Sequence, residues 1–196
     1  MRASCEGTDL NGESHNTKRQ ALLLFIAYMG FISLGLPDTL IGVAWPSVRD
    51  HFHLPQSAVA LIFFGSGFAY FFSSFFSGRL LRAFRVGTLL ALSSTLVACS
   101  GFGYASANIW FLFAACSLLH GLGSGAIDSG LNHYVAHHFS ARHMNWLHAC
   151  YSIGAMLGPL IMTSFIAWND SWRSGYLVVA GILLTLSILF ALTRRL

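Results

Sequence analysis

Residues 109–136 have the sequence IWFLFAACSLLHGLGSGAIDSGLNHYVA, which contains one acidic residue and no lysine or arginine. At 1.5 Å per residue, a helix of this length can cross the roughly 30 Å of hydrocarbon in a bilayer. Five more apolar runs of spanning length are found at residues 21–46, 57–77, 86–105, 146–168 and 174–194. The sequence therefore predicts an all-α integral membrane protein with six transmembrane helices.

The composition excludes several other classes of protein. Hydrophobic residues make up 55% of the 196 residues and charged residues only 9%, which is too much apolar surface for one soluble core. The net charge of +4 is spread between the apolar runs, so no nucleic-acid partner is expected. The chain lacks the motifs of phosphate-binding loops, zinc hydrolases and serine elbows, so we expect no enzyme. We expect no metal or other cofactor, because the histidines between His133 and His148 lack companion ligands.

The positions of lysine and arginine predict the orientation in the membrane. Nine of the eleven fall on one side: Arg2, Lys18, Arg19, Arg79, Arg82, Arg85, Arg142, Arg194 and Arg195. The other side holds Arg49 and Arg173. Because cytoplasmic loops carry the excess of positive charge, both termini are expected in the cytoplasm and the protein in the cell membrane. We interpret residues 1–19 as a disordered cytoplasmic tail and 20–196 as one six-helix bundle.

The first and fourth spans share a short motif. Gly35-Leu-Pro-Asp38 and Gly125-Ala-Ile-Asp128 each place an acid three residues after a glycine, at a similar distance from the start of the span. The two spans cross the membrane in opposite directions, so the two acids lie at depths related by a two-fold axis in the membrane plane. This pattern predicts a 3+3 inverted repeat.

The fourth span offers the main candidate for chemistry. One helical face carries small and polar residues: Ser117, Gly121, Gly125, Asp128 and Asn132. An acid inside the membrane is costly and by default marks a substrate or proton pathway. The alternative is that the span ends near Ile127 and leaves Asp128 at the cytoplasmic interface. We favour the first interpretation, because the apolar pattern continues beyond Asp128. His120, in the middle of the span, is expected to make an internal hydrogen bond.

The first and fifth spans supply further candidates. Pro37 and Asp38 could mark an outer loop, but the apolar residues 39–45 favour an intramembrane Asp38 beside a proline kink. His148 and Tyr151 are neighbours at i, i+3 and could contact one ligand, or they could be an interfacial pair. The candidate solute-binding residues are Asp38, Asn132, His148 and Tyr151.

Three segments carry a resemblance to a known family. They are Gly78-Arg-Leu-Leu-Arg-Ala-Phe-Arg85 after the second span, the stretch 154–159, and Trp172-Arg-Ser-Gly-Tyr176. Together they resemble the N-terminal half of the major facilitator superfamily, across residues 20–196. The first segment departs from the family pattern at Arg82, where an aspartate is usual, and at Arg85, where a glycine is usual.

Within that superfamily the chain looks most like the fucose permease and related sugar permeases. Asp128 and Asn132 match an acid and an asparagine of that branch's fourth helix, and His148 and Tyr151 fall at sugar-contacting positions of its fifth helix. The resemblance implies proton-coupled symport of a sugar or a similar small polar solute, with Asp128 carrying the coupling proton.

The number of spans departs from this resemblance, because such transporters have twelve helices. The chain could form a homodimer or pair with a separate second six-helix half. It could also be an inactive truncated half-transporter. A membrane scaffold or assembly subunit is the alternative from a different class. The sequence leaves these possibilities open.

The charge asymmetry gives a direct test of topology. Reporter fusions at Asn16 and at Leu196 are both expected to report the cytoplasm, because an even number of spans returns the chain to its starting side. Termini on opposite sides would mean an odd number of spans and would contradict the predicted bundle.

Overall fold

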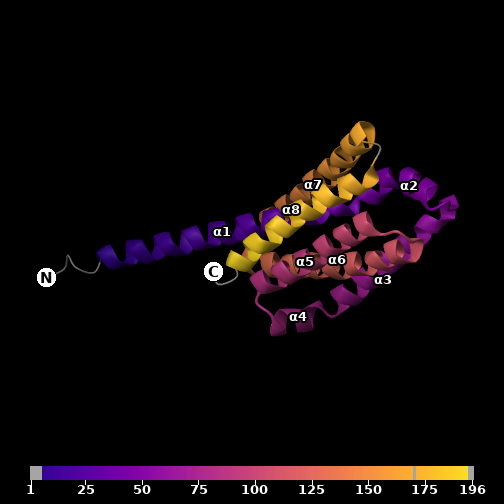
Figure 1. Ribbon diagram of the computed structural model, residues 1–196. Coiled ribbons are helices and arrows are strands. Elements are labelled where there is room, and N and C mark those ends of the chain that lie inside the picture. The colour runs from indigo at the N-terminus through magenta and orange to yellow at the C-terminus, as the bar shows by residue number, and fades with distance from the viewer. Residues whose placement is uncertain (1–5, 170, 194–196) are drawn as a thin grey trace.

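The computed structural model describes the backbone of residues 6–169 and 171–193, and the side chains of 20–168 and 171–193. All regular elements in these ranges are helices (Figure 1). They are α1 (Glu6–Asp38), α2 (Leu40–His51), the 3-10 turn η1 (Gln56–Ala58), α3 (Val59–Phe75), α4 (Ser77–Ala83), α5 (Val86–Ser106), α6 (Trp110–His138), α7 (Ala141–Asn169) and α8 (Trp172–Thr193).

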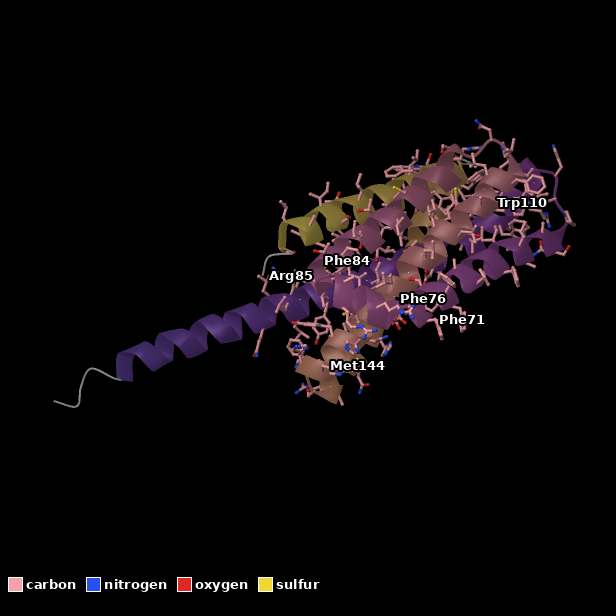
Figure 2. All side chains as sticks on the ribbon, turned by 90° about the horizontal axis from the view of Figure 1, so that it is seen from below. Phe71, Phe76, Phe84, Arg85, Trp110 and Met144 are labelled. Carbon is pink, nitrogen blue, oxygen red and sulfur yellow. The ribbon has the colours of Figure 1, made fainter. Side chains whose placement is uncertain are left out.

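Six segments of the described chain are long and apolar enough to cross a membrane. They are Gln20–His51, Gln56–Phe75, Val86–Ser106, Trp110–His138, Ala141–Trp168 and Trp172–Thr193. The predicted fold class is therefore confirmed. The start of α1 and the end of α8 point to the same end of the bundle (Figure 1). Figure 2 shows Arg85 and Met144 toward this end and Trp110 at the other.

Two segments outside the predicted spans are helical in the structure. The connection after the second span contains the short helix α4. Helix α1 begins at Glu6, so helical backbone covers residues 6–19 of the predicted tail, while residues 1–5 lie outside the described residues. This stretch contains no proline, and extending an existing helix costs far less than starting a new one.

The first span is interrupted where α1 ends at Asp38 and α2 begins at Leu40. Pro37 lacks an N–H group and its ring clashes with the carbonyl one turn earlier, which breaks the helical ladder here. Thr39 stabilises the break by donating its hydroxyl hydrogen to the Ala155 carbonyl on α7 at 2.9 Å. The interruption places the Asp38 carboxylate within the span, as the proline kink predicts.

Three of the four most extensive helix contacts in the described chain follow the symmetry of an inverted repeat, whereas the fourth, between α5 and α6, has no equally extensive mate between α8 and the first span. Helix α1 packs along α7, and α3 packs along α6. These are the first–fifth and second–fourth span pairs, which a two-fold axis relating the first three spans to the last three would exchange. The third and sixth spans, α5 and α8, pack against each other and so form a pair that the axis maps onto itself.

Glycines allow both exchanged pairs to approach at backbone distance. A Cβ atom at Gly35 would overlap the Tyr151 carbonyl, and one at Gly154 would overlap the Ile32 carbonyl, both across the α1–α7 contact. Across the α3–α6 contact, a Cβ at Gly125 would lie 2.6 Å from the Tyr70 carbonyl oxygen. Small residues that permit such contacts are the usual basis of helix association in membranes.

An aromatic cluster fills the end of the bundle away from the termini. Phe113 on α6 is fully buried there, and its ring centre lies 4.6 Å from Tyr104 and 5.6 Å from Trp172. Arg173 stacks over the Trp172 ring and donates to the Ala105 carbonyl at 2.6 Å. This cluster joins α5, α6 and α8 into a rigid support for the interior described below.

The glycine contacts predict which small residues the fold depends on. Gly154→Leu is expected to lower the free energy of unfolding by about 1–3 kcal/mol, because the new side chain forces α1 and α7 apart. Thermal unfolding in detergent micelles measures the change. Gly42→Leu is the matched control, since a Cβ there meets no heavy atom within 4 Å. Equal destabilisation by both variants would contradict the role of the close contact.

Candidate functional site

A cavity of about 330 Å³ lies inside the bundle, between α1, α2, α3, α5, α6 and α8. Its polar wall is formed by Asp38, Ser66, Tyr70, Ser100, His120 and Ser124. Tyr104 and Tyr176 extend the aromatic cluster into the wall on the α5–α8 side. Among the described residues that line the cavity there is no lysine or arginine. The space therefore combines apolar surface with hydroxyl groups and one carboxylate–imidazole pair.

The carboxylate of Asp38 is held by partners from two other spans. His120 on α6 approaches Oδ1 through Nε2 at 2.9 Å, and Tyr151 on α7 donates its hydroxyl hydrogen to Oδ2 at 3.1 Å. The side chains of Asp38 and His120 are 25% and 11% exposed, so both groups are largely withdrawn from solvent. A protonated His120 would balance the charge of ionised Asp38 at this distance.

The carboxylate of Asp128 is held by two neutral donors. Tyr70 on α3 donates its hydroxyl hydrogen to Oδ2 at 2.6 Å, and Asn132 donates from Nδ2 to Oδ1 at 3.0 Å. Ser73 fixes α3 on α6 by donating its hydroxyl hydrogen to the Leu122 carbonyl at 2.8 Å. Tyr70 lines the cavity, whereas Asp128 is not among the described residues of its wall.

The two acid sites repeat one arrangement. In each, a glycine three residues before the acid packs on the backbone of a tyrosine, and that tyrosine's hydroxyl binds the acid. Gly35 and Asp38 pair with Tyr151 in this way, and Gly125 and Asp128 pair with Tyr70. The sites differ in the second donor, which is an imidazole for Asp38 and an amide for Asp128.

The major facilitator superfamily model matches residues 21–196, which is most of the chain. The chain belongs to the major facilitator superfamily. As a member of this superfamily it is a multi-pass membrane protein of a transporter family.

Three characterised proteins are similar in sequence to this chain, each at low identity. The chain is 26% identical over 152 residues to bypass of stop codon protein 6 of Saccharomyces cerevisiae, covering 76% of this chain and 30% of that protein. It is 27% identical over 171 residues to the glucose/mannose transporter GlcP of Bacillus subtilis, covering 82% and 40%. It is 26% identical over 144 residues to sodium-dependent glucose transporter 1 of Rattus norvegicus, covering 72% and 29%. The chain therefore spans between 29% and 40% of the length of these relatives.

The structure places four of the five predicted site residues in two hydrogen-bonded pairs. Asp38 lies with Tyr151, and Asp128 lies with Asn132. His148 is set apart, because its ring lies edge-on to Phe31 with centres 5.7 Å apart on an exposed part of α7. Within the described side chains, no three His, Cys, Asp or Glu residues gather as a metal site would require.

Two residues of the site were not among the predicted set. The expected internal hydrogen bond of His120 is confirmed, but the sequence gives no sign that its partner is Asp38. Tyr70 stands in a phenylalanine-rich span, where an aromatic residue is most simply a lipid-facing one. Its role depends on the α3–α6 contact, which no local pattern encodes.

Proposed function

We propose that the chain forms half of a secondary transporter that couples proton entry to uptake of a sugar or a similar small polar solute. The observation that carries this proposal is a cavity lined by polar groups next to an intramembrane acid whose two donors are neutral. Two of the three relatives above are named as glucose transporters, which supports a sugar as the solute.

The cavity wall favours a neutral solute that bears hydroxyl groups. Ser100 and Ser124 are 1% and 2% exposed, and their hydroxyls have no hydrogen-bond partner among the described residues. A buried hydroxyl without a partner costs about 1–3 kcal/mol, so a solute that reaches these hydroxyls through a small shift of the wall gains affinity. The Asp38 carboxylate can accept from a third hydroxyl, and Tyr104 and Tyr176 add aromatic side chains to the wall. An anionic solute would meet the carboxylate without a lining arginine or lysine to pair with it.

Charge balance assigns the coupling proton to Asp128 in this proposal. Ionised Asp38 has His120 within 2.9 Å as a counter-charge, so its ionised form is tolerated inside the bundle. The donors to Asp128 are a phenol and an amide, and neither brings a positive charge. An uncompensated carboxylate within a membrane span is costly, so Asp128 is the acid that gains most from taking up a proton. Tyr151 and Asn132 then hold the two acids in place.

The exposed faces of the bundle indicate where the rest of the transporter would pack. The second and fifth spans are the least buried of the six. Helix α3 presents a stripe of exposed phenylalanines, which are Phe64, Phe68, Phe71 and Phe75. Phe71 points away from the bundle in Figure 2. The cavity reaches this side at Phe63 and Gly67, which are also exposed. We propose that a homodimer mate or a second six-helix half covers these faces, including the exposed His148 of α7, and that the protein lies in the cell membrane with both termini in the cytoplasm.

Replacing the proposed proton carrier separates coupling from binding. Asp128→Asn mimics the protonated acid, so proteoliposomes with this variant are expected to lose proton-driven accumulation of D-glucose and D-mannose while retaining exchange across the membrane. Tracer uptake under an imposed proton gradient measures accumulation, and counterflow measures exchange. Accumulation by Asp128→Asn equal to that of the parent would show that another group carries the proton. No uptake by the assembled parent would favour the scaffold alternative.

Filling the cavity tests where the solute binds. Gly67 lines the cavity and a Cβ there meets no heavy atom within 4 Å, so Gly67→Leu places its side chain in open space. This variant is expected to reduce uptake by about tenfold or more, because the solute loses room and must displace the new side chain. Gly42→Leu is equally unhindered but does not line the cavity, and should transport like the parent. Full activity of Gly67→Leu at matched expression would place the solute elsewhere.

A further inference from the structure

Tyr70 is the one described residue that both lines the cavity and hydrogen-bonds to Asp128. We propose that Tyr70 is the positioning residue that links solute binding to proton uptake. A solute hydroxyl in the cavity accepts the hydrogen bond of the Tyr70 hydroxyl, which then leaves Asp128. The Asp128 carboxylate, having lost this donor, takes up a proton from water and becomes a neutral acid. The inference rests on the proposed function and extends it to a residue that the sequence analysis did not select.

The Tyr70 hydroxyl has Asp128 as its acceptor, and a solute in the cavity would offer a second one. Its 2.6 Å bond to Oδ2 is the shorter of the two that Asp128 receives, and a hydrogen bond to an ionised group is roughly twice as strong as a neutral one. Moving this hydroxyl away therefore makes the ionised carboxylate less stable. The Tyr70 backbone cannot drift, because it packs against Gly125 and the neighbouring Ser74 donates to the Gly125 carbonyl at 3.3 Å. The freedom lies in the side chain alone.

Among the described side chains, no charged group forms an ion pair with Asp128, so proton uptake there changes a charge that no neighbour directly balances. From α1 the nearest acid is Asp38, whose charge can be balanced by His120 of α6. From α7, Tyr151 donates to Asp38. Helix α4 packs on α6 and carries Arg79, which lies over the Phe76 ring with 5.2 Å to its centre, and also Arg82.

The two tyrosines of the repeat differ in whether they line the cavity. Tyr151 binds Asp38 in the arrangement that Tyr70 makes with Asp128, but Tyr151 is not among the described residues of the cavity wall. In the first pair the acid itself faces the cavity, and in the second pair the tyrosine does. From the cavity, a solute therefore meets Asp38 directly, but meets Tyr70 in place of Asp128. Because of this difference, Asp38 binds the solute and Asp128 binds the proton in the proposed mechanism.

Linkage turns this arrangement into a measurable coupling. If solute binding favours the protonated form of Asp128, then protonation must raise solute affinity by the same factor. Coupling free energies between sites correspond to factors of about 5–150. The parent is therefore expected to bind D-glucose at least about fivefold more tightly at acidic than at alkaline pH.

The experiment compares this pH dependence in the purified parent and in Tyr70→Phe by equilibrium binding of labelled D-glucose. Tyr70→Phe keeps the ring in the wall and removes only the hydroxyl, so the difference in affinity between acidic and alkaline pH is expected to fall below about twofold. The matched control is Tyr104→Phe, which removes a hydroxyl from the same wall among the rings of Phe113 and Tyr176 and should keep the pH dependence. A Tyr70→Phe variant with the pH dependence of the parent overturns the inference.

A double-mutant cycle guards against an effect on folding alone. If Tyr70 acts through Asp128, adding Tyr70→Phe to Asp128→Asn produces no further change in pH dependence. A further change of similar size in the double variant would show that Tyr70 acts by another route and would overturn the inference. A parent that binds neither D-glucose nor D-mannose at any pH would instead overturn the proposed sugar transport on which the inference rests.

Discussion

The close approach of α1 to α7 and of α3 to α6 is the contact on which the rest of this structure depends. In both pairs a glycine lies against a backbone carbonyl of the neighbouring helix, at a distance that no side chain would permit. Within a membrane, the hydrophobic effect does not drive helices together, so such van der Waals contact carries much of the association. The same contacts fix the positions of Tyr151 and Tyr70 relative to the acids. Packing and site are thus determined by one set of glycines.

The cost of a buried charge explains why the two acids have different partners. Asp38 forms part of the cavity wall and is paired with an imidazole that can carry a compensating charge. Asp128 is held by a phenol and an amide, which stabilise a carboxylate by hydrogen bonds without neutralising it. In a low-dielectric interior this difference is large, because hydrogen bonds from neutral groups offset only part of the desolvation of a charge. An inverted repeat has therefore produced two similar acid sites with different electrostatic properties.

The cavity lies beside both acid sites, so the difference between Asp38 and Asp128 bears on the proposed transport. The hydroxyls of Ser100 on α5 and Ser124 on α6 are buried and have no hydrogen-bond partner in the described part of the chain, so they retain unused hydrogen-bonding capacity. The cavity lining includes Phe63 and Gly67, which are exposed residues of α3, one of the two least buried spans. The solute site that we propose is thus walled by a single six-helix bundle and would be closed by another bundle that covers α3. In the transport that we propose, the solute would lie beside Tyr70 and the proton would bind Asp128, which lies on the other side of the Tyr70 hydroxyl.

The sequence by itself determined the membrane-embedded helical class, the six spans, the kink at Pro37 and the repeated Gly-x-x-Asp motif. Each of these follows from hydrophobic length, proline chemistry or residue spacing, which are local properties of the chain. It also selected both acids, because an ionisable residue in an apolar run is conspicuous in any fold. Only the tertiary structure decided that His120 pairs with Asp38 and Tyr70 with Asp128, residues 82 and 58 positions apart. Those pairings depend on which helices pack together and at what rotation, and a rotation of one helix by a single residue would turn Tyr70 away from Asp128.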